Sequence, residues 1–489
     1  MKMIKYTAKI LPLMVVALSF GACKKDFLNV NPQQNMDVAF VIEDLPTTKA
    51  AVMGTYSLLQ SPSYYGRSMM ILPDLMADNM YISRKNSSRY INYDQYIVTI
   101  NDSYATSSWN VLYRTVVNAN LIITKGEKLT VPETMVAEVN HLIGEAYALR
   151  GLAYFDLLRL YAEPYNATAG AGHIGVPVVI KSGTDKNDVI SPKRNTVKEG
   201  YDQVVSDLKK AVASLPVTPI GFSASNRGHI SHYAAEALLA RVYLYMGDYV
   251  NAELAATNVI TGNKYTLLTN ANYVSGSTSF RTQNNTESIF EIQFNATNNN
   301  GTDALANFLL QGSSYGDGLA TDDLFNSYKA SDVRRGFLPK GKRSGSGGED
   351  PAYVITKYNN TSTYEEGIKV IRLSEIYLIR AEARAKQTGK DALAAADLDV
   401  IAKRADATAV TTNATGQALI DLIIAENRKE FAFEGHRLFD LTRNKLSFTK
   451  YRTGGATVPA ASMVLKTVLP IPLSEMNAND NMEQNEGYK

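Results

Sequence analysis

The sequence is poor in the residues that build disulfides and metal centres, with one cysteine, one tryptophan and five histidines among 489 residues. A single thiol cannot form a disulfide within the chain. His229 and His232 are the only close histidine pair, and no third ligand stands at a useful spacing from them. Neither sign of charge dominates, with 50 Lys and Arg against 48 Asp and Glu, so there is no general electrostatic case for nucleic acid. We therefore expect no metal, no cofactor and no nucleic-acid partner.

Long apolar runs are also missing, except near the N-terminus. The cationic MKMIKYTAK is followed by ILPLMVVALSFGA, 13 residues that are too few to span a bilayer as a mature helix. Gly21 and Ala22 then precede Cys23, an arrangement that resembles a bacterial lipoprotein signal, although an ordinary secretory signal with a chance cysteine is the alternative. We predict a signal peptide over 1–22, acylation of Cys23 and a polar tether over 23–35. Residues 36–489 are predicted to form a single soluble domain.

Helical periodicity is the main pattern in the rest of the chain. Apolar residues recur at helical spacing in 106–129, 135–161, 196–215, 231–261 and 372–405. The last two stretches are each interrupted by a turn glycine, Gly247 or Gly389, with small and large residues at the offsets of a tetratricopeptide repeat. These patterns predict a mainly α fold, in which tetratricopeptide-like helix pairs form a scaffold with long irregular insertions and a few short strands.

Two insertions, approximately 62–105 and 262–367, are rich in aromatic and polar residues. Loops held on a rigid frame often carry binding residues, and tyrosines there could stack on sugars or peptides. The predicted ligand-binding residues are Asp78, Asn79, Tyr81, Arg84, Tyr104 and Tyr315. The alternative is that the tyrosines of 62–105 belong to a solvated and loosely folded insertion. Trp109, at helical spacing from other apolar residues, is expected in the core instead.

The stretch AENRKEFAFEGHRLFDLTRNK (425–445) contains the residue types of an acid/base active site. We interpret it as structural, with one helix ending at Glu434–Gly435 and the next starting at HRLFDLTRN. Glu430 and Glu434 would repel each other on one helix face unless arginines lie nearby. The predicted ionic network comprises Arg428, Glu430, Glu434 and Arg437, with Arg443 as a further candidate partner. No catalytic residue is predicted.

Six segments along the chain are together similar to one known family. They are GEAYALRGLAYFDLLRLYAEP (144–164), RNTVKEGYDQVVSDLKKA (194–211), GHISHYAAEALLARVYLYMGDYVNA (228–252), IRLSEIYLIRAEA (371–383), ENRKEFAFEGHRLFDLTR (426–443) and LPIPLSEMNANDNMEQNEGY (469–488). In this order, behind a lipoprotein-like signal, they resemble the SusD-like (RagB/SusD) outer-membrane nutrient-binding lipoproteins. The insertions depart from the family pattern, which leaves the ligand open.

The resemblance implies a fold of four tetratricopeptide-like helix pairs with an irregular second half. It also implies a lipid-anchored protein at the outer membrane, facing the cell surface, that binds an oligosaccharide or a peptide without cleaving it. Such proteins deliver their ligand to a SusC-like TonB-dependent transporter barrel. A surface glycan hydrolase and a pure interaction scaffold are the alternatives from other functional classes.

Overall fold

The computed structural model describes residues 42–181, 191–220 and 226–489. The predicted signal peptide, Cys23 and the tether lie outside these residues. The helices of the frame are α2 (Leu45–Leu59), α5 (Ser103–Gly126), α6 (Glu133–Tyr161), α7 (Val197–Ser214), α8 (His232–Met246), α9 (Tyr249–Thr261), α13 (Leu373–Ala385), α14 (Asp391–Ala405) and α15 (Gly416–Glu430). In the described part of the chain, no helix combines the length and the apolar character needed to cross a membrane.

The start of α7 and the turns within two of the predicted helix pairs lie where the sequence predicts them. Thr196 caps α7: its hydroxyl accepts a hydrogen bond from the Glu199 backbone N–H at 3.2 Å, and the Glu199 carboxylate accepts the Thr196 N–H at 2.7 Å. Gly247 separates α8 from α9 with a φ of +76°, and Gly389 separates α13 from α14 with a φ of +79°. Both angles lie in the left-handed region that glycine adopts at little cost. The predicted helix pairs, and with them the mainly α fold class, are confirmed.

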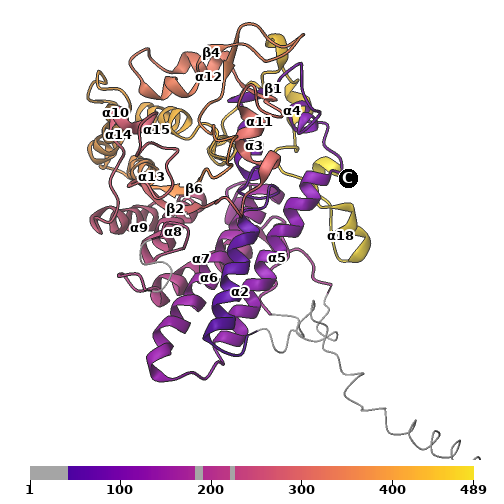
Figure 1. Ribbon diagram of the computed structural model, residues 1–489, viewed down its shortest axis with the longest axis vertical. Coiled ribbons are helices and arrows are strands. Elements are labelled where there is room, and N and C mark those ends of the chain that lie inside the picture. Colours follow the sequence, from indigo (N-terminus) through magenta and orange to yellow (C-terminus); the bar gives the residue numbers. More distant parts are fainter. Residues whose placement is uncertain (1–41, 182–190, 221–225) are drawn as a thin grey trace, which may run out of the picture.

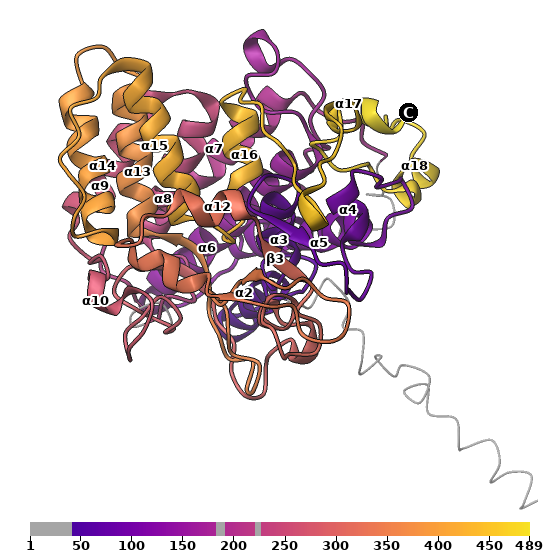
Figure 2. The same ribbon diagram turned by 90° about the horizontal axis from the view of Figure 1, so that it is seen from above.

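The pairs pack side by side into one curved layer. Contacts join α5 to α6, α6 to α7, α7 to α8 and α8 to α9, and then pass from α9 to α13 and on to α14 and α15. Seen from above, α9, α14, α13 and α15 stand together on one side of the molecule (Figure 2). The long helices α2, α5, α6 and α7 extend to the opposite end from the irregular half (Figure 1).

The short elements form the irregular half that covers this layer. They are α3 (Ser68–Leu75), β1 (Met80–Ile82), α4 (Ile91–Gln95), α10 (Asn270–Tyr273), β2 (Ser288–Ile292), α11 (Leu305–Leu309), β3 (Gly318–Ala320), α12 (Asp322–Ser327), β4 (Lys340–Gly341), β5 (Ala352–Val354), β6 (Ile368–Arg372), α16 (Arg437–Arg443), α17 (Ala460–Met463) and α18 (Leu473–Ala478). One antiparallel sheet has the strand order β1-β3-β5-β4, and β2 pairs with β6 in a second. Every residue of β2 and β6 is buried, so this ribbon joins the irregular half to the frame.

The aromatic insertion over 62–105 is packed, and the alternative of a solvated, loosely folded segment is wrong. Tyr90, Tyr93 and Tyr96 are each at most 3% exposed. Their hydroxyl groups find partners inside the protein; that of Tyr90 accepts from Arg67 Nε at 3.0 Å and lies 2.8 Å from Ser68 Oγ. A buried tyrosine usually finds such a partner, and for these three rings the side chains of Arg67, Ser68 and Asp102 and the Met76 carbonyl supply it.

Trp109 lies in the core, as its helical spacing predicts. It is 2% exposed, and its ring meets that of Tyr161 edge-on with the centroids 5.0 Å apart. The contact joins α5 to α6. Trp109 therefore holds the frame together and is not available for stacking on a ligand.

Candidate ligand-binding site

A cavity of about 440 Å³ opens where the four-stranded sheet meets α12 and a turn over 451–455. Figure 1 places β1, β4 and α12 at the end of the molecule opposite the tips of α6 and α7. The volume is within the range of small-molecule sites in proteins. Its lining residues are Tyr81, Thr321, Asp322, Asp323, Glu349, Pro351, Tyr451, Arg452, Gly454 and Gly455. We call this cavity the Tyr81 cleft.

Strand β1 places Tyr81 at the cleft. Met80 and Ile82 are buried, while Tyr81 between them is partly exposed, because successive side chains of a strand point to opposite faces. Burial, with the nearby carboxylates of Glu349 and Asp322, raises the pKa of Tyr81. The phenol therefore stays protonated at neutral pH and can both donate and accept a hydrogen bond.

The turn that carries Tyr451 and Arg452 forms another part of the lining. Gly454 and Gly455 have φ values of +69° and +77°, a pair of left-handed conformations that favours glycine. Lys450 anchors the turn, since its ammonium group is buried and donates to Asp94 Oδ1 at 2.7 Å and to the Met80 carbonyl at 2.9 Å. The anchor fixes this turn, and with it Tyr451, beside β1.

The charged groups of the cleft differ in how firmly they are held. Glu349 is fixed, since it accepts from Ser83 Oγ at 2.6 Å and from the Arg84 backbone N–H at 2.7 Å. Asp322 is exposed at the first turn of α12. Arg452 lies 3.7 Å from the Asp94 carboxylate, and its Nε has no hydrogen-bond partner among the described residues. The cleft thus offers donors and acceptors beside two phenol rings, a combination suited to a ligand rich in hydroxyl groups.

One of the six residues predicted to bind ligand, Tyr81, lines the Tyr81 cleft. Arg84 is not among the lining residues, although its guanidinium lies 3.9 Å from the position that a Cβ on the lining residue Gly454 would take. Tyr81 lies in the middle of β1, and Arg84 lies in the loop that follows this strand.

Asp78 and Asn79 lie beneath the cleft and are committed to internal bonds. Asp78 is 7% exposed and accepts from Arg437 Nε at 2.7 Å and Nη2 at 2.8 Å. Asn79 is fully buried, accepting from Arg428 Nε at 2.9 Å and donating to Asp74 at 2.6 Å. Because these polar groups are already paired, the two residues support the cleft from below and do not face it.

Tyr104 and Tyr315 lie away from the Tyr81 cleft. Tyr104 stacks on Tyr90 with the ring centroids 4.2 Å apart, and the guanidinium of Arg89 covers Tyr315 at 3.7 Å from its centroid. Neither tyrosine is among the lining residues.

Sequence reasoning missed the second wall of the cleft, Tyr451 and Arg452. A signal was available in YRTGG, because two adjacent glycines after polar residues mark a tight turn. That signal says where the chain turns, but not which distant strand the turn faces.

The carboxylates of the predicted ionic network are buried and paired, but with other cations than predicted. Glu430 binds Arg334 at 2.8 Å and Arg372 at 2.6 Å, and it also contacts Arg404. Glu434 accepts from Lys357 at 2.5 Å and from Arg372 at 2.8 Å.

Arg428 and Arg437, predicted to pair with these glutamates, bind Asp78 instead, and Arg443 binds Glu382 and Asp440. The cations of Glu430 and Glu434 come from distant parts of the chain because the β2–β6 ribbon and the segments before it fold back over the end of α15.

The helix also ends earlier than predicted, at Glu430 rather than Glu434. Phe433 and Gly435 have φ values of +65° and +77°, so the chain turns sharply over 431–435. Asp74 fixes this turn, because its carboxylate accepts the Phe433 N–H at 2.9 Å and the Gly435 N–H at 3.0 Å. Burial raises the pKa of Asp74 to about 6, against these hydrogen bonds, which lower it.

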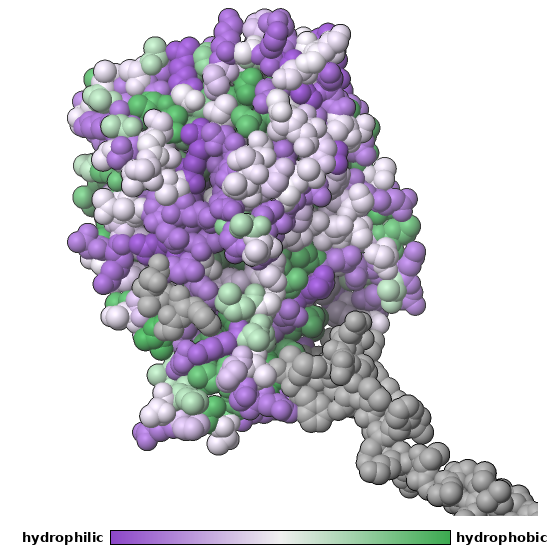
Figure 3. Space-filling model, viewed as in Figure 1, coloured by the Kyte–Doolittle hydropathy of each residue, from purple (hydrophilic) through white to green (hydrophobic). Residues whose placement is uncertain are grey.

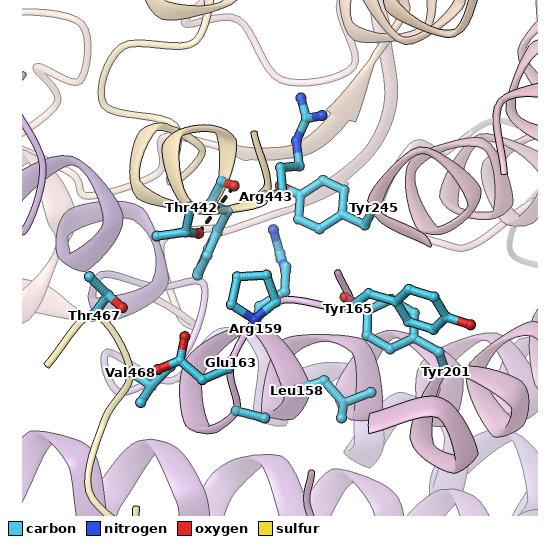
Figure 4. Close-up of a pocket in the computed structure, with 13 residues that line it drawn as sticks. Leu158, Arg159, Glu163, Tyr165, Tyr201, Tyr245, Thr442, Arg443, Thr467 and Val468 are labelled. Carbon is cyan, nitrogen blue, oxygen red and sulfur yellow. Dashed lines mark hydrogen bonds between the residues drawn. The ribbon is translucent and has the colours of Figure 1, made fainter. Parts of the chain in front are cut away.

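A second cavity lies between α6, α7, α8 and α16, and Figure 4 shows the residues that enclose it. The side chains of Arg159, Tyr245 and Arg443 converge there, but the volume is only about 20 Å³. That is room for a single water molecule, so this cavity is part of the packed interior and not a site for a nutrient.

Comparison with known proteins identifies the family to which the chain belongs. A family described as "Starch-binding associating with outer membrane" matches residues 26–244, and the "SusD family" matches residues 340–488. A protein of Bacteroides vulgatus with a known crystal structure is 30% identical; the match covers 92% of this chain and 100% of that one, with a TM-score of 0.80. The chain belongs to the SusD/RagB family.

Other relatives extend this result. A SusD superfamily protein from Bacteroides thetaiotaomicron is 28% identical over 91% of this chain and all of its own, with a TM-score of 0.79. SusD-like protein P2 of Formosa agariphila is 23% identical, and the match covers 90% of this chain and 92% of that protein.

Two matches are partial. SusD-like protein P38 of the same organism is 27% identical over 53% of this chain, which spans 46% of that protein. Starch-binding protein SusD of Bacteroides thetaiotaomicron is 41% identical over 26% of this chain and 23% of its own length. The family resemblance seen in the sequence is therefore confirmed. Membership of the SusD/RagB family does not by itself specify the ligand of this protein.

Proposed function

We propose that this SusD/RagB family member captures an oligosaccharide at the outer membrane, in the Tyr81 cleft, and releases it to a SusC-like TonB-dependent transporter without cleaving it. Lipid attached to Cys23 would anchor the protein, and the cleft would face the cell surface. The observation that carries the proposal is a cavity of about 440 Å³ at one end of the molecule, whose lining includes both Tyr81 and Tyr451.

The chemistry of the cleft favours a sugar. Phenol rings contact the apolar face of a sugar ring, while its hydroxyl groups need partners that donate and accept. Tyr81 and Tyr451 supply the rings, and Arg452, Asp322 and the Tyr81 hydroxyl supply hydrogen-bonding groups. A starch-binding relative and a family description that names starch binding support the same class of ligand.

Substitution of the rings tests the proposal. An aromatic contact contributes about 0.5–1.5 kcal/mol beyond its buried area, which is about a 2- to 12-fold change in Kd. We expect Tyr81→Ala and Tyr451→Ala each to raise the Kd for a neutral oligosaccharide by about 2- to 12-fold in isothermal titration calorimetry. Tyr104→Ala is the matched control, because this tyrosine lies outside the cleft.

The other functional classes predict different results. A hydrolase would release reducing ends from a glycan pool, whereas a binding protein returns the ligand intact. A peptide-binding member would bind a peptide array and ignore glycans. A pure scaffold would bind neither, and Tyr81→Ala would then change nothing. Equal affinities of the wild-type protein and both cleft variants for every bound glycan would refute the Tyr81 cleft as the site.

A further inference from the structure

A separate cavity of about 230 Å³ lies between the C-terminal end of α2, the segment before α8 and the end of β2. Its lining residues are Met53, Tyr56, Ser57, Gln60, Asn226, Gly228, His229, Ile292, Gln293, Asn295 and Asn298. Five of them are carboxamides, and none of these residues lines the Tyr81 cleft. We call it the amide cavity. Figure 3 shows a hydrophilic band across the middle of this face, at the height of β2 and β6 in Figure 1.

The floor of the amide cavity is rigid. Tyr56 and His229 are 7% and 5% exposed, and their rings meet with the centroids 4.8 Å apart. Both are tied to Glu145, a fully buried carboxylate of α6: the Tyr56 hydroxyl donates to it, and His229 Nδ1 lies 3.0 Å away. The Tyr56 oxygen also accepts the Ile230 N–H at 2.9 Å. A floor fixed in this way keeps its shape when a ligand enters.

The rim has hydrogen-bonding capacity to spare. Asn226 Oδ1 accepts the Gly228 N–H at 2.7 Å, and Asn295 Oδ1 accepts the Asn298 N–H at 2.9 Å. Within the described ranges, the Nδ2 groups of Asn226 and Asn295 donate no hydrogen bond, and Asn298 Oδ1 accepts none. The amide cavity therefore presents donors and an acceptor side by side, with the exposed thioether of Met53 as an apolar contact.

The rim of the amide cavity is uncharged and offers both amide N–H donors and amide carbonyl acceptors. Because each hydroxyl group both donates and accepts a hydrogen bond, this set suits a ligand with vicinal hydroxyl groups. One common way to bind an extended peptide is to add it as a strand to a free sheet edge. The outer edge of β2 is partly occupied, because the Glu291 N–H donates to the Arg227 carbonyl at 3.0 Å. The volume is about half that of the Tyr81 cleft, enough for one sugar ring.

We propose that the amide cavity is a second saccharide subsite, which holds a single neutral sugar unit through the carboxamides of Asn226, Asn295 and Asn298. This rests on the proposed function in one respect: both sites take the same class of ligand. The two sites are separate in structure, so each can fail without the other.

Ser57 allows a sharp test, because it is exposed on α2 at the wall of the amide cavity, and its hydroxyl donates to the Gly54 carbonyl of the same helix at 2.7 Å. Ser57→Trp fills the cavity without touching the core, and Ser57→Ala is the matched control that leaves it open. The measurement is saturation-transfer difference NMR of the full-length protein with glucose, galactose, mannose and xylose as separate probes, and triglycine as a peptide probe.

The expected result is a signal from at least one monosaccharide that persists in Ser57→Ala and Tyr81→Ala and falls at least fivefold in Ser57→Trp. A signal that disappears in Tyr81→Ala and survives in Ser57→Trp would overturn the subsite while supporting the Tyr81 cleft. Absence of any monosaccharide signal from the wild-type protein, or a signal from triglycine alone that Ser57→Trp removes, would also overturn it. The oligosaccharide titrations above decide the proposed function independently of these outcomes.

Discussion

Glu434→Gln tests whether the buried ionic network supports the fold rather than the ligand site. Glu434 is 5% exposed and accepts hydrogen bonds from Lys357 Nζ at 2.5 Å, Arg372 Nε at 2.8 Å and Arg372 Nη2 at 2.8 Å. A glutamine keeps the volume but removes the charge, and its NH₂ group would face these donors. Lys357 would then lose its carboxylate partner in a buried position, keeping the Glu430 and Ala432 carbonyls at 3.1 and 3.0 Å.

The expected loss is large. Removal of one partner from a buried ion pair costs about 3–5 kcal/mol, because the remaining charge is left uncompensated. The entropy of unfolding at Tm is about 2.1 cal/mol/K per residue, or about 0.9 kcal/mol/K for a folded body of about 450 residues. We therefore expect Tm to fall by about 3–5 °C.

Differential scanning calorimetry measures this change, and calorimetric titration with the bound glycan measures affinity, which we expect to stay constant. Glu486→Gln is the control, since Glu486 forms an exposed pair with Lys489 and its loss should leave Tm unchanged. The double variant Lys357→Met/Glu434→Gln should lose less than the sum of the two single variants, because it removes both charges. A Tm within 1 °C of the wild type, or a loss of affinity without a loss of stability, would refute the structural role of Glu434.

Three further predictions concern other sites. Burial raises the pKa of Glu366 to about 7 from 4.5, so the folded protein loses stability as pH rises from about 4.5 to 7. Glu366→Gln should therefore raise the free energy of unfolding by up to about 3 kcal/mol at pH 8 and leave it unchanged at pH 4 in denaturant titrations. Equal effects at both pH values would contradict this. Gly435→Ala should lower the free energy of unfolding by about 2 kcal/mol or more in denaturant titrations, because φ is +77° and the new Cβ would lie 2.4 Å from the Met69 carbonyl oxygen. A variant as stable as the wild type would contradict this and show that the turn relaxes freely. Cys23→Ser should abolish incorporation of labelled palmitate and release the protein from the membrane fraction, whereas label in the variant would place the lipid elsewhere.

The helical frame could be predicted from the sequence because its signals are local. Helical spacing, the capping box at Thr196 and the turn glycines Gly247 and Gly389 each act within a few residues of one another. Trp109 could be assigned to the core for the same reason, since its apolar neighbours follow on one helix. The family resemblance also followed from short segments in a fixed order.

The ionic network was predictable only in part. Buried carboxylates at 430 and 434 imply cations nearby, and local reasoning chose the arginines of the same segment. The actual partners of Glu430 include Arg372 and Arg334, 58 and 96 residues away, and Lys357 lies 77 residues from Glu434. A buried carboxylate requires a positively charged partner, and this much follows from the sequence. Which lysine or arginine pairs with it depends on how distant segments of the chain fold against the end of α15.

The sequence alone determined the frame, the position of its turns and the likeness to the SusD/RagB family, because these depend on interactions between neighbours. Only the tertiary structure decided which tyrosines are buried and which face a cleft, because burial depends on segments that meet across the fold. Lys450 reaches the carbonyl of Met80 across 370 residues and thereby brings Tyr451 to the same cleft as Tyr81. Sequence periodicity cannot predict a contact between residues so far apart in the chain, because the local pattern around each residue does not say where the other one lies.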